Sequence, residues 1–264
     1  MHERRIFDGA FLRATLFRGG SEKLFVSFRQ RLGQDGAFDD PKPSMKFIKE
    51  GYAHLHLQSR FNDWYINRET EALETRLSEL KSYGRRVGIG FSMGGYAAMR
   101  FAPVLRLQHL IAVLAQFTID PALVPQDRRY RRHAAGFDPV LGRIDENRAL
   151  KGALLFDPAH ALDKLHAQEL KLLCPNMELV PVWGGGHPAT GVIGSMKRFP
   201  RVQQQLVSGT VNSAALRALH RECRRNSPLY WTHLAQAAQT AGRRDLAHNA
   251  LVMAEQLTQS GEKS

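Results

Sequence analysis

The sequence is poor in cysteine and in long apolar runs, and both shortages limit what the protein can be. Its 264 residues include two cysteines, Cys174 and Cys223, too few for a disulfide framework or a zinc cluster. The longest apolar run covers residues 110–115, far below the roughly 20 residues that span a bilayer. The first five residues lead into no apolar segment, so we expect no secretory signal and a cytoplasmic location. We also expect no membrane span, cofactor or metal.

Charge is the unusual feature of the composition. The 37 Lys and Arg residues outnumber the 25 Asp and Glu residues, which gives a formal net charge of +12. At 43% hydrophobic and 23% charged residues, the chain is otherwise typical of a globular protein, which excludes a disordered chain or a coiled-coil rod. The positive charge suits nucleic acid, an anionic surface or an acidic ligand. Because no aromatic platform or nucleic-acid motif accompanies the basic residues, we expect no nucleic-acid partner.

Short apolar runs alternate with helical periodicity over the first two thirds of the chain. The runs predict strands over residues 11–17, 23–28, 52–57, 87–90, 110–114, 153–156 and 179–183. The first two strands, around Gly19 and Gly20, predict a β-hairpin. Helices are expected over residues 69–83, closed by Gly84, and over residues 94–101 and 164–173. Strands separated by helices predict an α/β fold, a mostly parallel sheet with helices on both faces.

The pattern becomes entirely helical after about residue 208. We therefore expect an α/β domain over residues 1–207 and a helical extension over residues 208–264. Helices are predicted over residues 230–240 and 245–257, and Ser227 with Pro228 forms a helix start in which serine is the N-cap and proline opens the first turn.

The stretch from Gly90 to Met99 carries the strongest chemical signal. An apolar strand leads into Gly-x-Ser-x-Gly, and a helix of small residues follows. Such a turn exposes the Ser92 hydroxyl in a strained backbone, and a Cβ at Gly90 or Gly94 would collide with neighbouring backbone. The N–H of Met93 would point at a developing oxyanion. The alternative is a glycine-rich turn in which Ser92 is a bystander.

A nucleophilic serine needs a base and an acid. His187 follows the last predicted strand and the glycines of residues 184–186, so a flexible loop could bring its ring to Ser92. Asp157 ends the preceding strand and Asp163 opens the next helix, where it could simply be an N-cap. Spacing does not choose between these two carboxylates as the group that orients His187.

The second oxyanion donor should come from the turn after residues 23–28. Its candidates are the backbone amides of Arg29 and Gln30. Two further histidines, His54 and His56, alternate along one strand, and we expect them on a sheet face rather than in a metal site.

Arginines cluster after residues 110–114, at Arg128, Arg129, Arg131 and Arg132. Guanidinium groups there could hold an anionic substrate near Ser92 through bidentate contacts. The alternative is a solvated basic helix face.

Over roughly residues 10–205 the sequence resembles the α/β-hydrolase superfamily, which uses the same order of serine, aspartate and histidine. More narrowly, it is similar to an uncharacterised bacterial group whose motifs are matched by four segments: Asn62-Asp63-Trp64-Tyr65, residues 92–98, residues 163–167 and Gly185-Gly186-His187. This resemblance implies that Asp163 is the acid. The turn at Arg29-Gln30-Arg31 departs from the group, in which small residues are more usual.

The extension resembles a single tetratricopeptide repeat, which implies docking of a protein partner, self-association or plain packing on the core. Together these features predict a serine hydrolase of the esterase, deacetylase or thioesterase type. It would form an acyl-enzyme from a small-molecule or glycan acyl ester, including an anionic one. The alternatives are an acyltransferase with the same triad and a non-catalytic binding protein of this fold.

Overall fold

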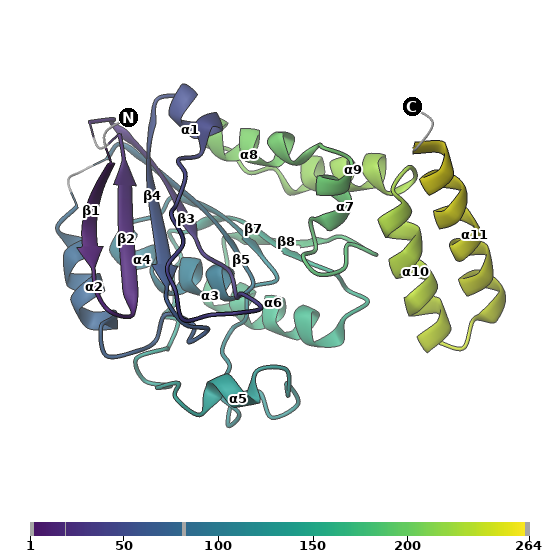
Figure 1. The fold of residues 1–264 in the computed structure, drawn as a ribbon, viewed down its shortest axis with the longest axis horizontal. Coiled ribbons are helices and arrows are strands. Elements are labelled where there is room, and N and C mark those ends of the chain that lie inside the picture. Colours follow the sequence, from purple (N-terminus) through teal and green to yellow (C-terminus); the bar gives the residue numbers. More distant parts are fainter. Residues whose placement is uncertain (1–2, 19, 81–82, 262–264) are drawn as a thin grey trace.

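The computed structural model describes residues 3–18, 20–80 and 83–261, and its centre is an eight-stranded sheet (Figure 1). The strand order is β1-β2-β4-β3-β5-β6-β7-β8. β1 and β4 pair antiparallel with β2, and the remaining neighbours are parallel, so the predicted mostly parallel sheet is confirmed. The strands are β1 (Glu3–Asp8), β2 (Leu12–Phe17), β3 (Lys23–Phe28), β4 (Tyr52–Ser59), β5 (Arg85–Phe91), β6 (His109–Val113), β7 (Lys151–Phe156) and β8 (Met177–Pro181).

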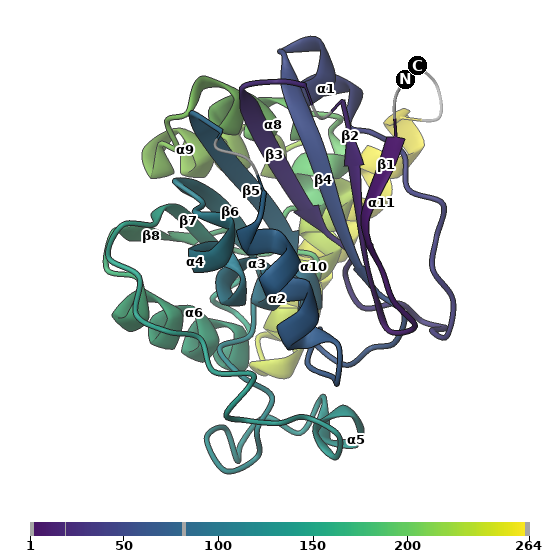
Figure 2. The same ribbon diagram turned by 90° about the vertical axis from the view of Figure 1, so that its left-hand side faces the viewer.

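Helices cover both faces of the sheet (Figure 2). One face packs against α2 (Thr70–Ser78), α3 (Met93–Arg100), α4 (Ala102–Leu105) and α6 (Ala161–Leu173). The other packs against α1 (Met45–Lys49), α7 (Gly191–Ser195), α8 (Phe199–Ser208) and α9 (Ser213–Arg224). Each face has its own hydrophobic cluster, because the central strands are apolar on both sides. None of the helices in the described ranges is long and apolar enough to cross a membrane.

The predicted hairpin of the first two strands is wrong. β4 lies between β2 and β3 and pairs with both, with Leu12 opposite Ser59 and Lys23 opposite Tyr52. Seven of the eight residues of β4 are buried, so this strand belongs inside the sheet rather than at its side. Gly19, part of the predicted turn, lies outside the described residues.

The predicted helix over residues 69–83 is shorter than expected. α2 ends at Ser78, and residues 81–82 lie outside the described ranges. Gly84 is therefore not a helix cap. Its N–H donates to the carbonyl of Glu22 at 2.9 Å, just before β5 begins.

The C-terminal helices form a hairpin that projects from the sheet. α10 (Pro228–Thr240) and α11 (Arg244–Gly261) lie at the end of the molecule opposite β1 (Figure 1). The Ser227 side chain accepts a hydrogen bond from the Tyr230 N–H, and Pro228 occupies the first turn, as the sequence predicts. A further short helix, α5 (Arg131–Ala134), lies in the segment between β6 and β7, which we call the insertion (residues 117–150).

Candidate active site

Ser92 occupies the sharp turn between β5 and α3. Its backbone has φ 50 and ψ −122, a conformation that costs energy for any residue with a Cβ. The Ser92 N–H donates to the Val113 carbonyl at 2.8 Å, which ties the turn to β6. A Cβ on Gly90 would lie 2.2 Å from the carbonyl oxygen of Gly94, so these glycines have the steric role that the motif predicts. The turn therefore holds the hydroxyl in a fixed place at the start of a helix.

The turn after β3 packs directly against the start of α3. A Cβ on Gly94 would lie 2.8 Å from the Phe28 carbonyl oxygen and 2.9 Å from that of Arg29. The Arg29 N–H donates to the Leu57 carbonyl at 2.9 Å and so is already used. The Gln30 N–H has no acceptor within the described chain. Of the two predicted second donors, Gln30 is thus the one that an oxyanion could use.

The Asn-Asp-Trp-Tyr segment (residues 62–65) contacts the turn after β3 through Tyr65. Trp64 and Tyr65 have φ of 55 and 62, and both are fully buried. The Tyr65 hydroxyl lies 2.9 Å from the Arg29 carbonyl oxygen and 3.0 Å from that of Leu57. Burial raises the pKa of Tyr65 far above its usual range, so the phenol keeps its proton and can donate. The motif therefore fixes the loop that carries Gln30.

An aromatic residue of the insertion lies beside Ser92. The Trp64 and Tyr130 rings have centroids 4.7 Å apart, and Trp64 Nε1 donates to Gln116 Oε1 at 3.1 Å. Burial raises the pKa of Tyr130, against the opposing effects of Arg129 and of a hydrogen bond with Ser92. Tyr130 was not among the predicted site residues. In the sequence it stands out only as a single aromatic residue within a run of arginines.

Four charged or polar side chains form a network between the insertion and α6: Asp127, Arg129, Asp163 and His166. Arg129 Nη2 donates to Asp127 Oδ2 at 2.8 Å, and its Nη1 donates to Asp163 Oδ1 at 2.6 Å. His166 Nδ1 accepts from the Phe117 N–H at 3.1 Å, so Nε2 carries the proton that is donated to Asp127 at 2.9 Å. Burial opposes ionisation of Asp127, but the hydrogen bonds from His166 and Arg129 outweigh it and hold the pKa of Asp127 well below its usual range.

The four arginines predicted to bind substrate do not form one anion site. Arg129 is committed to two carboxylates, and hydrogen bonds to Asp127 and Asp163 raise its pKa despite burial, which acts the other way. Arg131 Nη2 donates to the Pro125 carbonyl at 2.6 Å, and Arg132 Nε lies 3.2 Å from His133 Nε2. Arg128 is exposed on the surface of the insertion. The predicted cluster is thus divided between holding the insertion and facing solvent.

His187 lies within the loop between β8 and α7, which we call the His187 loop (residues 182–190). His187 is exposed, and its ring makes no hydrogen bond within the ranges that the structure describes. Desolvation by the surrounding loop lowers the pKa of His187. Asp163 raises that pKa, and Arg129 and Arg31 lower it further. The imidazole is therefore neutral near pH 7, as a general base must be. Arg31 was not among the predicted site residues.

The two candidate acids have different surroundings. Asp157 Oδ1 accepts from the Ala159 N–H and Oδ2 from the Gly186 N–H, both at 3.0 Å, so this carboxylate holds backbone. Asp163 lies in the first turn of α6 rather than at its N-cap, which is His160. It is 5% exposed and faces inward with Ala167. Asp163 is also the carboxylate that acts electrostatically on His187.

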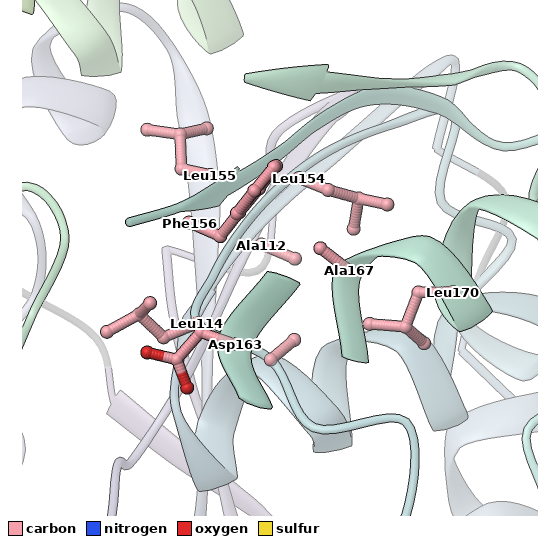
Figure 3. Close-up of a pocket in the computed structure, with 9 residues that line it drawn as sticks. Ala112, Leu114, Leu154, Leu155, Phe156, Asp163, Ala167 and Leu170 are labelled. Carbon is pink, nitrogen blue, oxygen red and sulfur yellow. The ribbon is translucent and has the colours of Figure 1, made fainter. Parts of the chain in front are cut away.

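Figure 3 shows Asp163 at the edge of a narrow apolar recess between β6, β7 and α6. Its walls are aliphatic side chains such as Leu114 and Leu154, and the space is too small for a water molecule. The Asp163 side chain is buried there, with 4% of its surface exposed. Its charge is balanced by Arg129 on the side of the insertion.

His54 and His56 lie on the sheet face, as predicted. Both bind the Ser27 hydroxyl at 2.7 Å, through His54 Nε2 and His56 Nδ1. Burial lowers the pKa of His54 to about 3 and that of His56 to about 4. Within the described ranges, no three His, Cys, Asp or Glu side chains gather as metal ligands would.

No protein-family model matches the chain, and no curated protein matches its sequence. Its fold does occur in solved structures. A mutant of the capsule O-acetyltransferase of Neisseria meningitidis serogroup A, in complex with CoA, matches with a TM-score of 0.53 and 13% identity over 76% of this chain and 93% of the other. An esterase of Pyrococcus furiosus, Pf2001, matches with a TM-score of 0.47 and 15% identity over 80% of this chain and 91% of the other.

An α/β-hydrolase enzyme from the metagenome of sediments from the lagoon of Mar Chica, Morocco, matches with a TM-score of 0.47 and 14% identity over 79% of this chain and 99% of the other. At these identities the likeness concerns the fold. The chain has an α/β-hydrolase fold, with C-terminal helices added to it.

Proposed function

We propose that the protein is a serine hydrolase of the α/β-hydrolase type, which cleaves an acyl ester or thioester through an acyl-enzyme. The observation that carries this proposal is the strained backbone of Ser92, held between β5 and α3 by close glycine contacts. A purely structural role at this helix N-terminus would not require a strained backbone. The strain at Ser92 therefore points to a functional role.

In the proposed reaction, Ser92 Oγ forms a bond to the carbonyl carbon while His187 takes the hydroxyl proton. The carbonyl oxygen becomes an oxyanion that accepts hydrogen bonds from the N–H groups of Met93 and Gln30. The leaving alcohol or thiol then departs with the proton of His187. Water repeats the sequence on the acyl-enzyme, which releases the carboxylic acid and restores Ser92.

In this proposal Asp163 is the acid. Arg129 occupies its Oδ1, and Oδ2 remains to receive the Nδ1–H of the imidazolium that forms during attack. Asp157 is not needed for that role, because both of its oxygens hold backbone amides.

A second candidate is acyl transfer, in which a hydroxyl of a glycan or small molecule replaces water. The likeness to the capsule O-acetyltransferase in complex with CoA favours it. The basic residues near His187, Arg31 among them, would suit an anionic donor or acceptor in either reaction.

The test is covalent labelling with a fluorophosphonate probe, followed by mass mapping of the labelled peptide. The wild-type protein should be labelled at Ser92, and Ser92→Ala should abolish labelling. Ser27→Ala is the matched control, since the Ser27 hydroxyl is hydrogen-bonded to His54 and His56 but lies on the sheet, away from the turn that holds Ser92. A folded wild-type protein that stays unlabelled would leave only a binding role for this fold.

A panel of short acyl esters, and acetyl-CoA with and without a glycan acceptor, then separates hydrolysis from transfer. Free acid in the absence of acceptor indicates hydrolysis, whereas product formation that requires the acceptor indicates an acyltransferase.

A further inference from the structure

The backbone that leads to His187 is held by hydrogen bonds from outside its own loop. His220 Nε2, on α9, donates to the Trp183 carbonyl at 2.9 Å. His233 Nδ1, on α10, donates to the Gly184 carbonyl at 2.9 Å. Asp157, after β7, accepts from the Gly186 N–H at 3.0 Å. Trp183, Gly184 and Gly186 are thus each held by a hydrogen bond just before the proposed base, the first two by residues of the C-terminal extension.

The glycines of this loop do not act as a flexible spacer. Gly184 and Gly186 have φ of 69 and 71, the left-handed region that favours glycine. A Cβ on Gly184 would lie 2.8 Å from the Tyr230 ring, and one on Gly186 would lie 2.1 Å from the His233 ring. The loop therefore fits closely against α10, and side chains at these positions would separate the two.

The extension is also joined to the element that follows the loop. Ser195 Oγ of α7 lies 3.1 Å from Ser227 Oγ, the N-cap of α10. A Cβ on Gly191 would lie 3.2 Å from the Leu229 side chain. α10 thus contacts both ends of the segment that carries His187, while α11 packs on α10 and extends away from the sheet (Figure 1).

We propose that His233 and His220 are positioning residues for His187, so that the C-terminal extension completes the active site without contributing an atom to the reaction. This inference rests on the proposed function. A general base must lie within hydrogen-bond reach of its proton, and displacement of about 1 Å can cost about 100-fold in rate. In this proposal His220 of α9 and His233 of α10 set this distance by holding the loop backbone.

The proposal requires of His233 that it donate a hydrogen bond from Nδ1 to the Gly184 carbonyl. Substitutions that keep or remove this donor therefore test it. His233→Asn keeps a donor close to the Nδ1 position, and His233→Ala removes it. His248→Ala is the control, since His248 is exposed on α11 of the same hairpin. All variants are made in the full-length chain, and melting temperatures establish that each is folded.

The first readout is the rate of fluorophosphonate labelling and the kcat for a short acyl ester. We expect His233→Ala to lower both by about 10-fold to 100-fold with KM nearly unchanged, and His233→Asn to remain within about 3-fold of wild type. His248→Ala should match wild type. The proposal is overturned if folded His233→Ala retains full kcat, or if the asparagine variant is as slow as the alanine variant.

The second readout is hydrogen–deuterium exchange in peptides covering residues 182–190, which needs no activity. Exchange should rise in His233→Ala and stay at the wild-type level in His233→Asn and His248→Ala. Unchanged exchange in His233→Ala refutes positioning whatever the enzyme does. Conversely, a wild-type protein without labelling at Ser92 refutes the proposed function, and the exchange result then shows separately whether the extension holds the loop.

Discussion

Removal of Arg129 should destabilise the protein because two carboxylates depend on it. The Asp127 and Asp163 side chains are 3% and 4% exposed, and Arg129 ion-pairs with both. Loss of one partner of a buried pair typically costs about 3–5 kcal/mol. The Arg129 side chain is itself 31% exposed, so solvent screens part of the interaction. For Arg129→Met we therefore expect a loss of about 2–3 kcal/mol in the free energy of unfolding.

Urea unfolding followed by circular dichroism measures this loss. The control is Arg143→Met, because Arg143 pairs with Asp145 on the surface, where the side chains are 76% and 60% exposed. That variant should stay within about 0.5 kcal/mol of wild type. Combining Arg129→Met with Asp163→Asn should cost less than the sum of the single changes, because the two residues are coupled.

Enzyme kinetics of the Arg129→Met variant provide a second test. If Arg129 holds the triad acid, Arg129→Met should lower kcat and raise the pKa of His187, since Arg129 lowers that pKa in the intact protein. If Arg129 instead binds a substrate anion, KM should rise while stability stays unchanged. That outcome would refute the interpretation of the ion pairs.

Three further predictions follow from the site and the sheet. Gly94→Ala places a Cβ 2.8 Å from the Phe28 carbonyl oxygen, so the turn that carries Gln30, the proposed second oxyanion donor, must move, and kcat should fall by about 10-fold to 1,000-fold. Arg31→Gln removes a charge that lowers the pKa of His187, so the acidic limb of kcat/KM should shift to higher pH. His54, buried with a pKa of about 3, should make the protein less stable as pH falls below about 6.5. Urea unfolding should show that His54 accounts for about 2 kcal/mol of the stability lost between pH 7 and pH 5. In His54→Gln this contribution to the pH dependence of stability should be absent.

Each of these changes has a control. Gly136→Ala adds a Cβ with nothing within 4 Å and should leave kcat unchanged. Arg4→Gln removes an exposed charge on β1, at the opposite edge of the sheet from β8, and should not shift the pH profile. His248→Gln should keep the pH dependence of stability. Wild-type kcat in Gly94→Ala, equal profiles for both arginine variants, or an unaltered slope in His54→Gln would contradict the corresponding argument.

The part of the site that could be predicted from sequence is the part made by neighbouring residues. Gly90, Ser92 and Gly94 lie within one turn, so their spacing alone contains the geometry. Ser227 and Pro228 are local in the same way and begin α10 as predicted. Steric and capping rules act over a few residues, which is the range that a single sequence displays.

What could not be predicted depends on partners distant in the chain. The pairing of β2 with β4 rather than with β3 is decided by burial of the whole sheet. Arg129 meets Asp163 across 34 positions, and nothing in its basic surroundings distinguishes it from the exposed Arg128. A run of arginines in the sequence therefore does not indicate which of them faces the candidate active site.

The contact between His233 and Gly184 also has a consequence in time. During synthesis His187 leaves the ribosome first, and His233 follows 233 − 187 = 46 residues later. At about 5–20 residues per second, roughly 2–9 s separate the two. During that interval the turn that holds Ser92 and the sheet can already be folded, while the backbone before His187 still lacks the carbonyl contact that α10 provides. In the proposed enzyme, a nascent chain would thus fold the turn that holds Ser92 before the backbone next to His187 gains its contact with His233.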